Sequence, residues 1–270
     1  MRTQVSITSI FLMLIIGASI GPSIVVADGF MDNVDLSSPD MTEPEMTREE
    51  LIKLLASAKS GERIDLVSKR FSGLDLSGVD FRGANLRSAR FNKTNLSGAN
   101  LSGVNLDIGW MMEANLENAN LSGASLFSTQ MQRANLKNAN LTKARVVANL
   151  SRANLEGADF TNANLAADMK NQSMGLMRAV FRSANLDNTN FTNAKAARTD
   201  LEFASLRGAN LSDADFTMAE MAGADLEGAT VKGLNLDGAD LESVILKKLK
   251  YGDKVIGMDT AKNLDSAYKD

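Results

Sequence analysis

Residues 84–106, ANLRSARFNKTNLSGANLSGVNL, repeat a five-residue unit whose third position is Leu or Phe. The position two before this centre is usually Ala, and the position directly before it is usually Asn or Asp. Because alternate residues of an extended chain point to the same side, Ala and the centre face inward together and the Asn or Asp faces outward. The other two positions are polar or small, which leaves room for a corner. Each unit therefore predicts a short extended side followed by a turn.

The same unit fills most of the chain. Its centres run from Leu66 to Val146, from Leu150 to Leu165 and from Leu176 to Leu246, which makes 36 units. Repeated turns of one hand generate a coil, and stacked coils satisfy one another's backbone groups at roughly 4.8 Å per layer. Bulky centres recur every 20 residues, which predicts four sides per coil and about nine coils; they are Phe71, Phe91, Met111 and Met131.

This pattern resembles the motif of the pentapeptide repeat family, A(D/N)LXX. The resemblance covers about residues 62–250 and is carried by segments such as Ala84-Asn85-Leu86, Ala114-Asn115-Leu116, Ala153-Asn154-Leu155 and Ala209-Asn210-Leu211. It implies an all-β solenoid, a right-handed quadrilateral parallel β-helix, with no catalytic residue in the motif. A lone match would mean little, whereas a long run in register is specific.

The N-terminus has the features of an export signal. Arg2 precedes an apolar stretch, Ile10–Ile16, and Val25-Val26-Ala27 offers small residues for cleavage, so residues 1–27 are predicted to be a signal peptide. The alternative is an uncleaved anchor, but polar and helix-breaking residues interrupt the apolar run before it reaches about 20 residues. The prediction is an exported protein without a membrane span after cleavage. Its compartment would be a periplasm, or a thylakoid lumen in a photosynthetic source.

Three further segments flank the repeats. Residues 28–47 are acidic and are predicted to be a solvated linker. Residues 48–61 are predicted to be an N-terminal capping helix, because Thr47 and Glu50 have the spacing of a capping box. Residues 251–270 are predicted to be a C-terminal cap containing a weaker helix. Its apolar stripe is Met258, Ala261, Leu264, Ala267 and Tyr268. If this cap covers the last coil incompletely, two copies could pair end to end as a homodimer, because uncovered sheet edges associate.

Composition limits the chemistry. The 29 Lys and Arg residues face 33 Asp and Glu residues, and there is no Cys and no His. Disulfides, zinc sites built on these residues, thiol nucleophiles and histidine bases are therefore excluded. The charge is too balanced for a nucleic-acid-binding arm. We expect the protein not to be an enzyme and to bind no cofactor. We also expect the outward carboxylates, Asp200 among them, to be solvated.

One edge departs from the outward-polar rule. Trp110 takes an outward slot next to the centre Met111, and the irregular stretch 166–175 should emerge near the same corner. Contiguous exposed apolar surface commonly marks an interface. The candidate partner-binding residues are Ile108, Trp110, Met112, Phe127, Val147, Met169 and Met174. The alternative is that the insertion folds back over Trp110 and Phe127 and buries them as a small structural cluster.

These features predict a non-catalytic interaction or scaffold module whose partner is another protein. Two alternatives stay open. The resemblance extends to cytoplasmic family members that mimic duplex DNA and bind DNA gyrase, which would require a cytoplasmic chain. The methionines suggest Cu(I) binding through thioethers, although Met111, Met131 and Met221 are core centres that replace Leu.

Overall fold

The computed structural model describes residues 34–57, 63–169 and 177–270, of which residues 35–270 belong to one compact unit. The predicted signal peptide, Met174 and the predicted repeat centre Leu176 lie outside the described residues. None of the described helices has the length and apolar character needed to cross a membrane.

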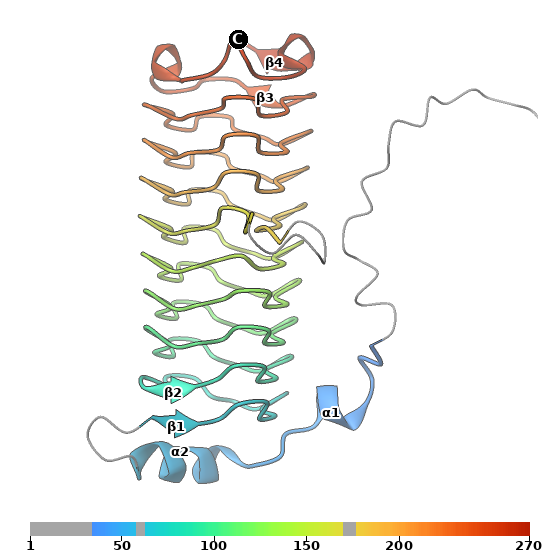
Figure 1. The fold of residues 1–270 in the computed structure, drawn as a ribbon, viewed down its shortest axis with the longest axis vertical. Helices are drawn as coiled ribbons and strands as arrows, with labels where there is room; N and C mark the ends of the chain where they lie inside the picture. Colours follow the sequence, from blue (N-terminus) through green and yellow to red (C-terminus); the bar gives the residue numbers. More distant parts are fainter. Residues whose placement is uncertain (1–33, 58–62, 170–176) are drawn as a thin grey trace, which may run out of the picture. The chain divides into compact units, whose positions relative to one another are not determined.

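This unit is a stack of coils (Figure 1), and four rows of parallel bridges join each coil to the next. The rows contain the pairs Arg70↔Arg90, Asp75↔Asn95, Asp80↔Asn100 and Asn85↔Asn105, whose partners are 20 residues apart. The backbone of each coil bonds to both neighbouring coils; for example, the N–H of Leu66 donates to the oxygen of Asn85 at 2.9 Å. The four-sided coil predicted from the 20-residue spacing is therefore present.

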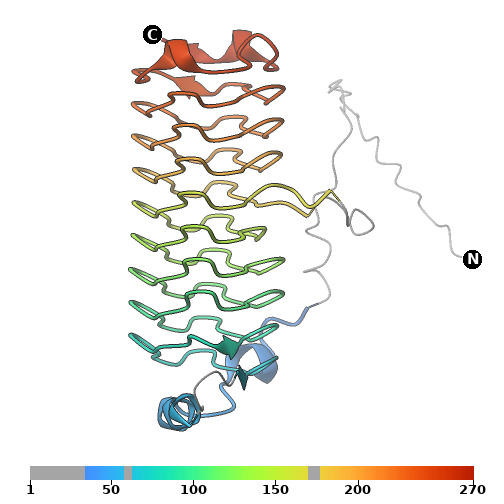
Figure 2. The same cartoon turned by 60° about the vertical axis from the view of Figure 1, so that its left-hand side comes forward.

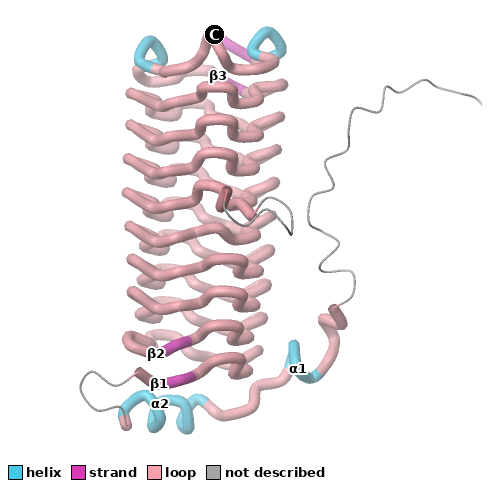
Figure 3. The backbone as a smooth tube through the Cα atoms, in the orientation of Figure 1, coloured by secondary structure: helices cyan, strands magenta, loops and turns pink. Residues whose placement is uncertain are grey.

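Regular strands are few because each side contributes a single bridged residue between two corners (Figure 3). The two described parallel strand pairs lie near the ends of the stack. Strand β1 (Ile64–Asp65) pairs with β2 (Ala84–Asn85), and β3 (Ile245–Leu246) pairs with β4 (Tyr268–Lys269).

The predicted centres form one continuous hydrophobic core. Leu86, Phe91 and Leu96 are fully buried, and the described centres of the coils that follow are also buried. Where Phe repeats in one row the rings stack: Phe160 and Phe191 lie 4.8 Å apart with an interplanar angle of 4°. Burial of these side chains is the main stabilising term, at roughly 1.5–3 kcal/mol for each large apolar group.

Two helices precede the coils. Helix α1 (Pro39–Thr42) is short, and α2 (Arg48–Ala56) begins with the predicted capping box between Thr47 and Glu50. Leu51 of α2 is fully buried and belongs to the core cluster, so the helix covers the first coil (Figure 1). The helix ends at Ala56, several residues before the predicted boundary.

The predicted C-terminal helix is wrong. The chain instead forms two 3₁₀ turns, η2 (Gly252–Lys254) and η3 (Leu264–Ser266), and then β4. The bridges Asn235↔Ile256 and Asp240↔Lys262 continue the rows through this segment. Pairing with the previous coil satisfies backbone groups that an isolated short helix would leave open, so an irregular extra coil forms in place of a helix.

Both changes of register fall at one corner of the coil. Arg145 and Asn149 occupy neighbouring rows only four residues apart, so the corner between them is one residue short. One coil later, Asn164 pairs with Lys195 while Val180 pairs with Asn149, so the extra residues form a long corner and not a side. The two described arms of this insertion, joined by the antiparallel bridge Asp168↔Met177, leave the side of the stack (Figure 2).

Candidate interaction surfaces

Trp110 lies in one of the four bridged rows, here named the Trp110 row. Its neighbours in the row are Arg90 and Gln130, and the Trp110 N–H donates to the oxygen of Ala89 at 2.9 Å. The repeat itself aims the indole outward, because Met111 fills the inward slot and is fully buried. The row comprises Arg70, Arg90, Trp110, Gln130, Asn149, Val180, Asp200, Glu220, Asp240 and Lys262.

The corner that leads into this row, formed by residues 107–109, 127–129 and 147–148, is named the Trp110 corner. Ile108 is 38% exposed and has φ of 61°. Phe127 is half-buried beneath the Arg145 guanidinium, whose carbon lies 4.0 Å from the ring centroid. A cation over an aromatic face is attracted by the ring quadrupole. Arg145 also reaches Asp168 at 3.4 Å, which ties the base of the insertion to this corner.

The other predicted edge residues differ in how far they are exposed to solvent. Met112 is half-buried beside Trp110, and Met169 is 49% exposed on the insertion. Val147 is only 2% exposed, so its place on an exposed edge is wrong. The missing residue at its corner draws Val147 into the stack, next to Ala148, which the motif already places inward. Met174 lies outside the described residues.

Residues 35–46, here named the strap, contact the start of the Trp110 row and are not a solvated tether. Met41 is only 5% exposed, and its carbonyl accepts a hydrogen bond from the amide of Asn92 at 3.2 Å. Asp40 pairs with Arg70, and Glu45 pairs with Lys69 at 2.7 Å. An apolar anchor and two acidic contacts therefore hold the strap in place, which its acidic composition alone did not reveal.

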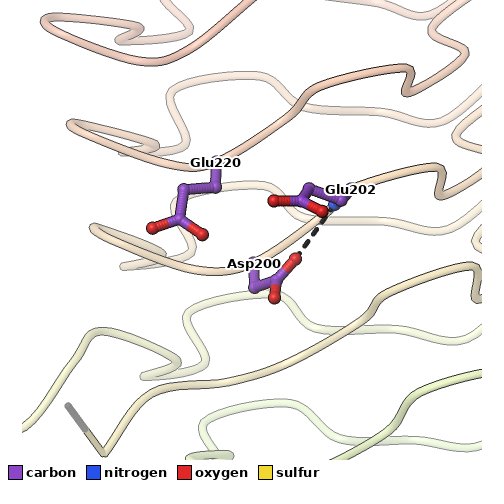
Figure 4. A group of neighbouring side chains, drawn as sticks. All are labelled: Asp200, Glu202 and Glu220. Carbon is purple, nitrogen blue, oxygen red and sulfur yellow. Dashed lines mark hydrogen bonds between the residues drawn. The ribbon is translucent and has the colours of Figure 1, made fainter. Parts of the chain in front are cut away.

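The same row contributes Asp200 and Glu220 to a buried ion cluster, whose three carboxylates are drawn in Figure 4. Asp200 is fully buried, and its carboxylate lies 3.4 Å from the Arg178 guanidinium and 2.9 Å from that of Arg182. Arg178 also pairs with Glu220 at 2.6 Å, and Arg182 pairs with Glu202 at 2.9 Å. The expectation that Asp200 is solvated is therefore wrong. Arg178 follows the insertion and covers the carboxylate, a placement that the row assignment could have suggested.

Burial raises the pKa of Glu202, partly offset by Arg182, while the neighbouring carboxylates of Asp200 and Glu220 add to the rise. Oxygens of these three carboxylates lie within 4.8 Å of one another, a separation that a metal ion could bridge. Arg178 and Arg182 already supply positive charge at this position, so the arrangement is that of a structural ion network.

Three of the methionines are not available as copper ligands. Met111, Met131 and Met221 are fully buried as centres of the stack, so their thioethers do not face solvent. They pack as flexible substitutes for Leu.

Comparison with known proteins identifies the repeat. The family model for Pentapeptide repeats matches in eight copies, at residues 70–107, 111–145, 148–167, 176–213 and 209–247. No curated protein matches the chain in sequence.

Several solved structures are similar. HetL, a pentapeptide repeat protein involved in heterocyst differentiation regulation from the cyanobacterium Nostoc sp. strain PCC 7120, is 26% identical; the match covers 83% of this chain and 94% of HetL, with a TM-score of 0.34. Full-length QnrB1, a plasmid-mediated fluoroquinolone resistance protein, is 18% identical over 74% of this chain and 93% of its own, with a TM-score of 0.40. A pentapeptide repeat protein from the Arabidopsis thaliana thylakoid lumen is 26% identical over 39% of this chain and 63% of its own, with a TM-score of 0.20.

The family-model matches span more than half of the chain and fall on the stacked coils described above, whose units have the Ala, Asn or Asp, and Leu order of the motif. The chain belongs to the pentapeptide repeat family, whose fold is a right-handed β-helix.

Proposed function

We propose that this protein is a non-catalytic protein-interaction module that binds its partner through the Trp110 corner and the adjoining part of the Trp110 row. The observation that carries the proposal is Ile108. A β-branched residue at φ of 61° is strained, and this one also exposes 38% of its surface. The fold requires neither the backbone strain nor the exposed apolar side chain, since Gly98, Gly103 and Gly123 occupy the same turn position in other units. Strain retained at an exposed apolar residue is typical of functional sites.

The neighbouring side chains have the chemistry of a binding surface. Trp110, Arg90 and Met112 are partly exposed on adjacent coils. Trp and Arg dominate the energetics of protein interfaces, and Met adapts to different partners. A stacked β-helix holds these residues at fixed spacing, so little ordering of the surface is needed when a partner binds.

The test is photo-crosslinking in the source cells, with wild type compared with Trp110→Ala. We expect the partner crosslink to fall at least about tenfold, in line with the loss of an interface hot spot. Ile52→Ala is the control, because Ile52 is another exposed apolar residue, at 43%, but lies on helix α2 and away from this corner. Equal crosslinking by wild type and Trp110→Ala would contradict the proposal.

The family relationship agrees better with a gyrase-binding partner than with an exported scaffold, so DNA gyrase is the second candidate. The charge distribution gives it a specific location. The later part of the Trp110 row carries Asp240, with the exposed Glu242 beside it, outside the buried ion cluster, whereas the first part of the row carries Arg70 and Arg90. A DNA-like acidic surface would therefore lie on the C-terminal half of the stack.

A supercoiling assay separates the two candidates. A gyrase-binding chain inhibits or protects gyrase, and Asp240→Asn together with Glu242→Gln weakens the effect, since these carboxylates are outside the buried ion cluster. Export predicts no effect on gyrase and a mature N-terminus at Asp28, which N-terminal mass analysis of the protein recovered from cell fractions would show.

A further inference from the structure

We propose that the stretch of the Trp110 row beyond the strap, centred on Arg90, Trp110 and Met112, docks an acidic segment of the partner protein that carries an apolar anchor. The inference rests on the proposed function and names the chemistry of the partner. It is argued from an interface that this chain already forms with its own strap.

The strap shows which chemistry this face of the stack recognises. Its acidic side chains pair with Lys69 and Arg70, its Met41 is buried, and its backbone bonds to the face. The Glu45 N–H donates to the oxygen of Arg70 at 3.1 Å, and Asn92 donates to the Met41 carbonyl. Acidic side chains, one apolar anchor and exposed backbone groups are thus sufficient for binding here.

The next coils repeat these elements. Asn92 links the two stretches, because its side-chain oxygen accepts the Met112 N–H at 3.0 Å while its amide holds the strap. Trp110 and Met112 provide partly exposed apolar surface on the next coil. This surface could take an apolar anchor in the way that the start of the row buries Met41. Three buried side-chain atoms have no hydrogen-bond partner among the described residues: Oγ of Ser72, Nε of Arg90 and Oε1 of Gln132.

Charge favours an anionic segment. Arg87, Arg90 and Lys93 form no ion pair with any described residue, whereas Lys69 and Arg70 are already neutralised by the strap. The nearby carboxylates are Asp107, which accepts from the Phe127 N–H and the Ser125 hydroxyl, and Glu113, which is exposed one coil after Lys93 at the same corner; they number two against three cations. The stretch therefore presents more unpaired positive than negative charge.

A peptide fits this surface better than a single-stranded nucleic acid does. Nucleic-acid platforms stack successive bases on successive aromatic rings. Here the residues before and after Trp110 in the row are Arg90 and Gln130. One aromatic residue between polar neighbours matches a single apolar anchor.

The test uses a synthetic peptide with the strap sequence, DLSSPDMTEPEM, added to the full chain. Trp110 is the only tryptophan, so its fluorescence reports binding directly. We expect a saturable change that weakens as salt rises. Arg90→Gln should raise the Kd about tenfold through loss of a charge-assisted contact. Lys232→Gln, which removes an exposed cation from a different row, should leave the Kd unchanged.

Several outcomes would overturn the proposal. A peptide with its four acidic residues changed to amides would bind as tightly, or Arg90→Gln would bind the acidic peptide as well as wild type does. If Arg70→Gln weakened binding as much as Arg90→Gln, the peptide would be replacing the strap. Tighter binding of a single-stranded oligonucleotide would indicate a nucleic-acid site. If a chain starting at Asp35 bound at least about tenfold tighter than the full chain, the occupant would be the chain's own N-terminal segment.

The outcomes also separate this inference from the proposed function. If the peptide fails to bind while Trp110→Ala still removes the partner crosslink, the acidic chemistry is wrong and the interaction surface is retained. If the crosslink does not depend on Trp110, the interaction surface itself is wrong.

Discussion

At the residue scale, the second position of each turn is the one at which a side chain causes backbone strain. Many of these positions have positive φ, and they carry Gly, Asn and Ser repeatedly, as at Gly98, Asn118 and Ser128. Glycine adopts this conformation without the Cβ penalty that other residues meet. Ile108 is the β-branched exception among them, and the proposed interaction surface is built around it.

Replacing Ile108 with Gly should stabilise the protein. Relief of the left-handed penalty exceeds the added chain entropy of Gly, for a net gain of about 0.5–1 kcal/mol. Urea unfolding would measure it, with Ser128→Gly at the equivalent turn position as the control and a smaller gain expected. A clear loss of stability in Ile108→Gly would mean that the isoleucine packs against its surroundings and is not held for binding.

A second prediction at this scale concerns Asp200. Asp200→Asn should destabilise the protein by about 3 kcal/mol, because Arg178 and Arg182 lose the buried carboxylate that they share. Asp213→Asn is the matched control: Asp213 is exposed at a turn with φ of 56°, which Asn also adopts. Thermal unfolding of the two variants would compare them. If Asp200→Asn and Asp213→Asn had equal unfolding temperatures, the ion cluster would not contribute to stability.

At the scale of the element, the two ends of the stack illustrate different limits of pattern analysis. The N-terminal helix has a capping box, Thr47 with Glu50, which is local chemistry and could be predicted. At the C-terminal end Met258, Ala261 and Leu264 recur every three residues and resemble a helical stripe. The structure packs all three against the core from a coil of turns and bridges. The three-residue spacing was compatible with a helix and with an extra coil. Backbone pairing with the previous coil favoured the coil.

Helix α2 should protect the first coil through one side chain. Leu51→Ala removes a fully buried side chain and leaves a cavity, so the expected loss of unfolding free energy is about 2–5 kcal/mol. Ile52 is 43% exposed on the same helix, and Ile52→Ala should cost much less. Chemical denaturation, with limited proteolysis of the N-terminal coils as a second readout, would measure the difference. Similar losses for both variants would mean that α2 does not cover the core.

At the scale of the whole molecule, each coil contacts only its neighbours, so the open ends decide how copies associate. Helix α2 covers the first coil, whereas the last coil ends in β4, with Ile256 and Tyr268 56% and 57% exposed. Unpaired strand edges are templates for further pairing. We therefore propose that two copies associate end to end through the C-terminal coil.

Sedimentation equilibrium would test this association. We expect wild type to dimerise and Tyr268→Lys to shift the equilibrium toward monomer, because a charged edge opposes strand pairing. Phe203→Lys should leave the dimer unchanged, since Phe203 is exposed on the side of the stack. A wild-type monomer at every accessible concentration would exclude the end-to-end dimer.

The sequence by itself determined the repeat, the inward centres and the four-sided coil, because each unit carries its own complete pattern of Ala, Asn and Leu. Long-range placement was decided only by the tertiary structure. The short corner drew Val147 inside, the insertion brought Arg178 over Asp200, and the acidic strap docked Met41 on the Trp110 row. These contacts join residues from different coils or segments, and their energies depend on which rows meet in space. A five-residue pattern fixes the row of a residue within the repeat, but it cannot say what an irregular segment will cover.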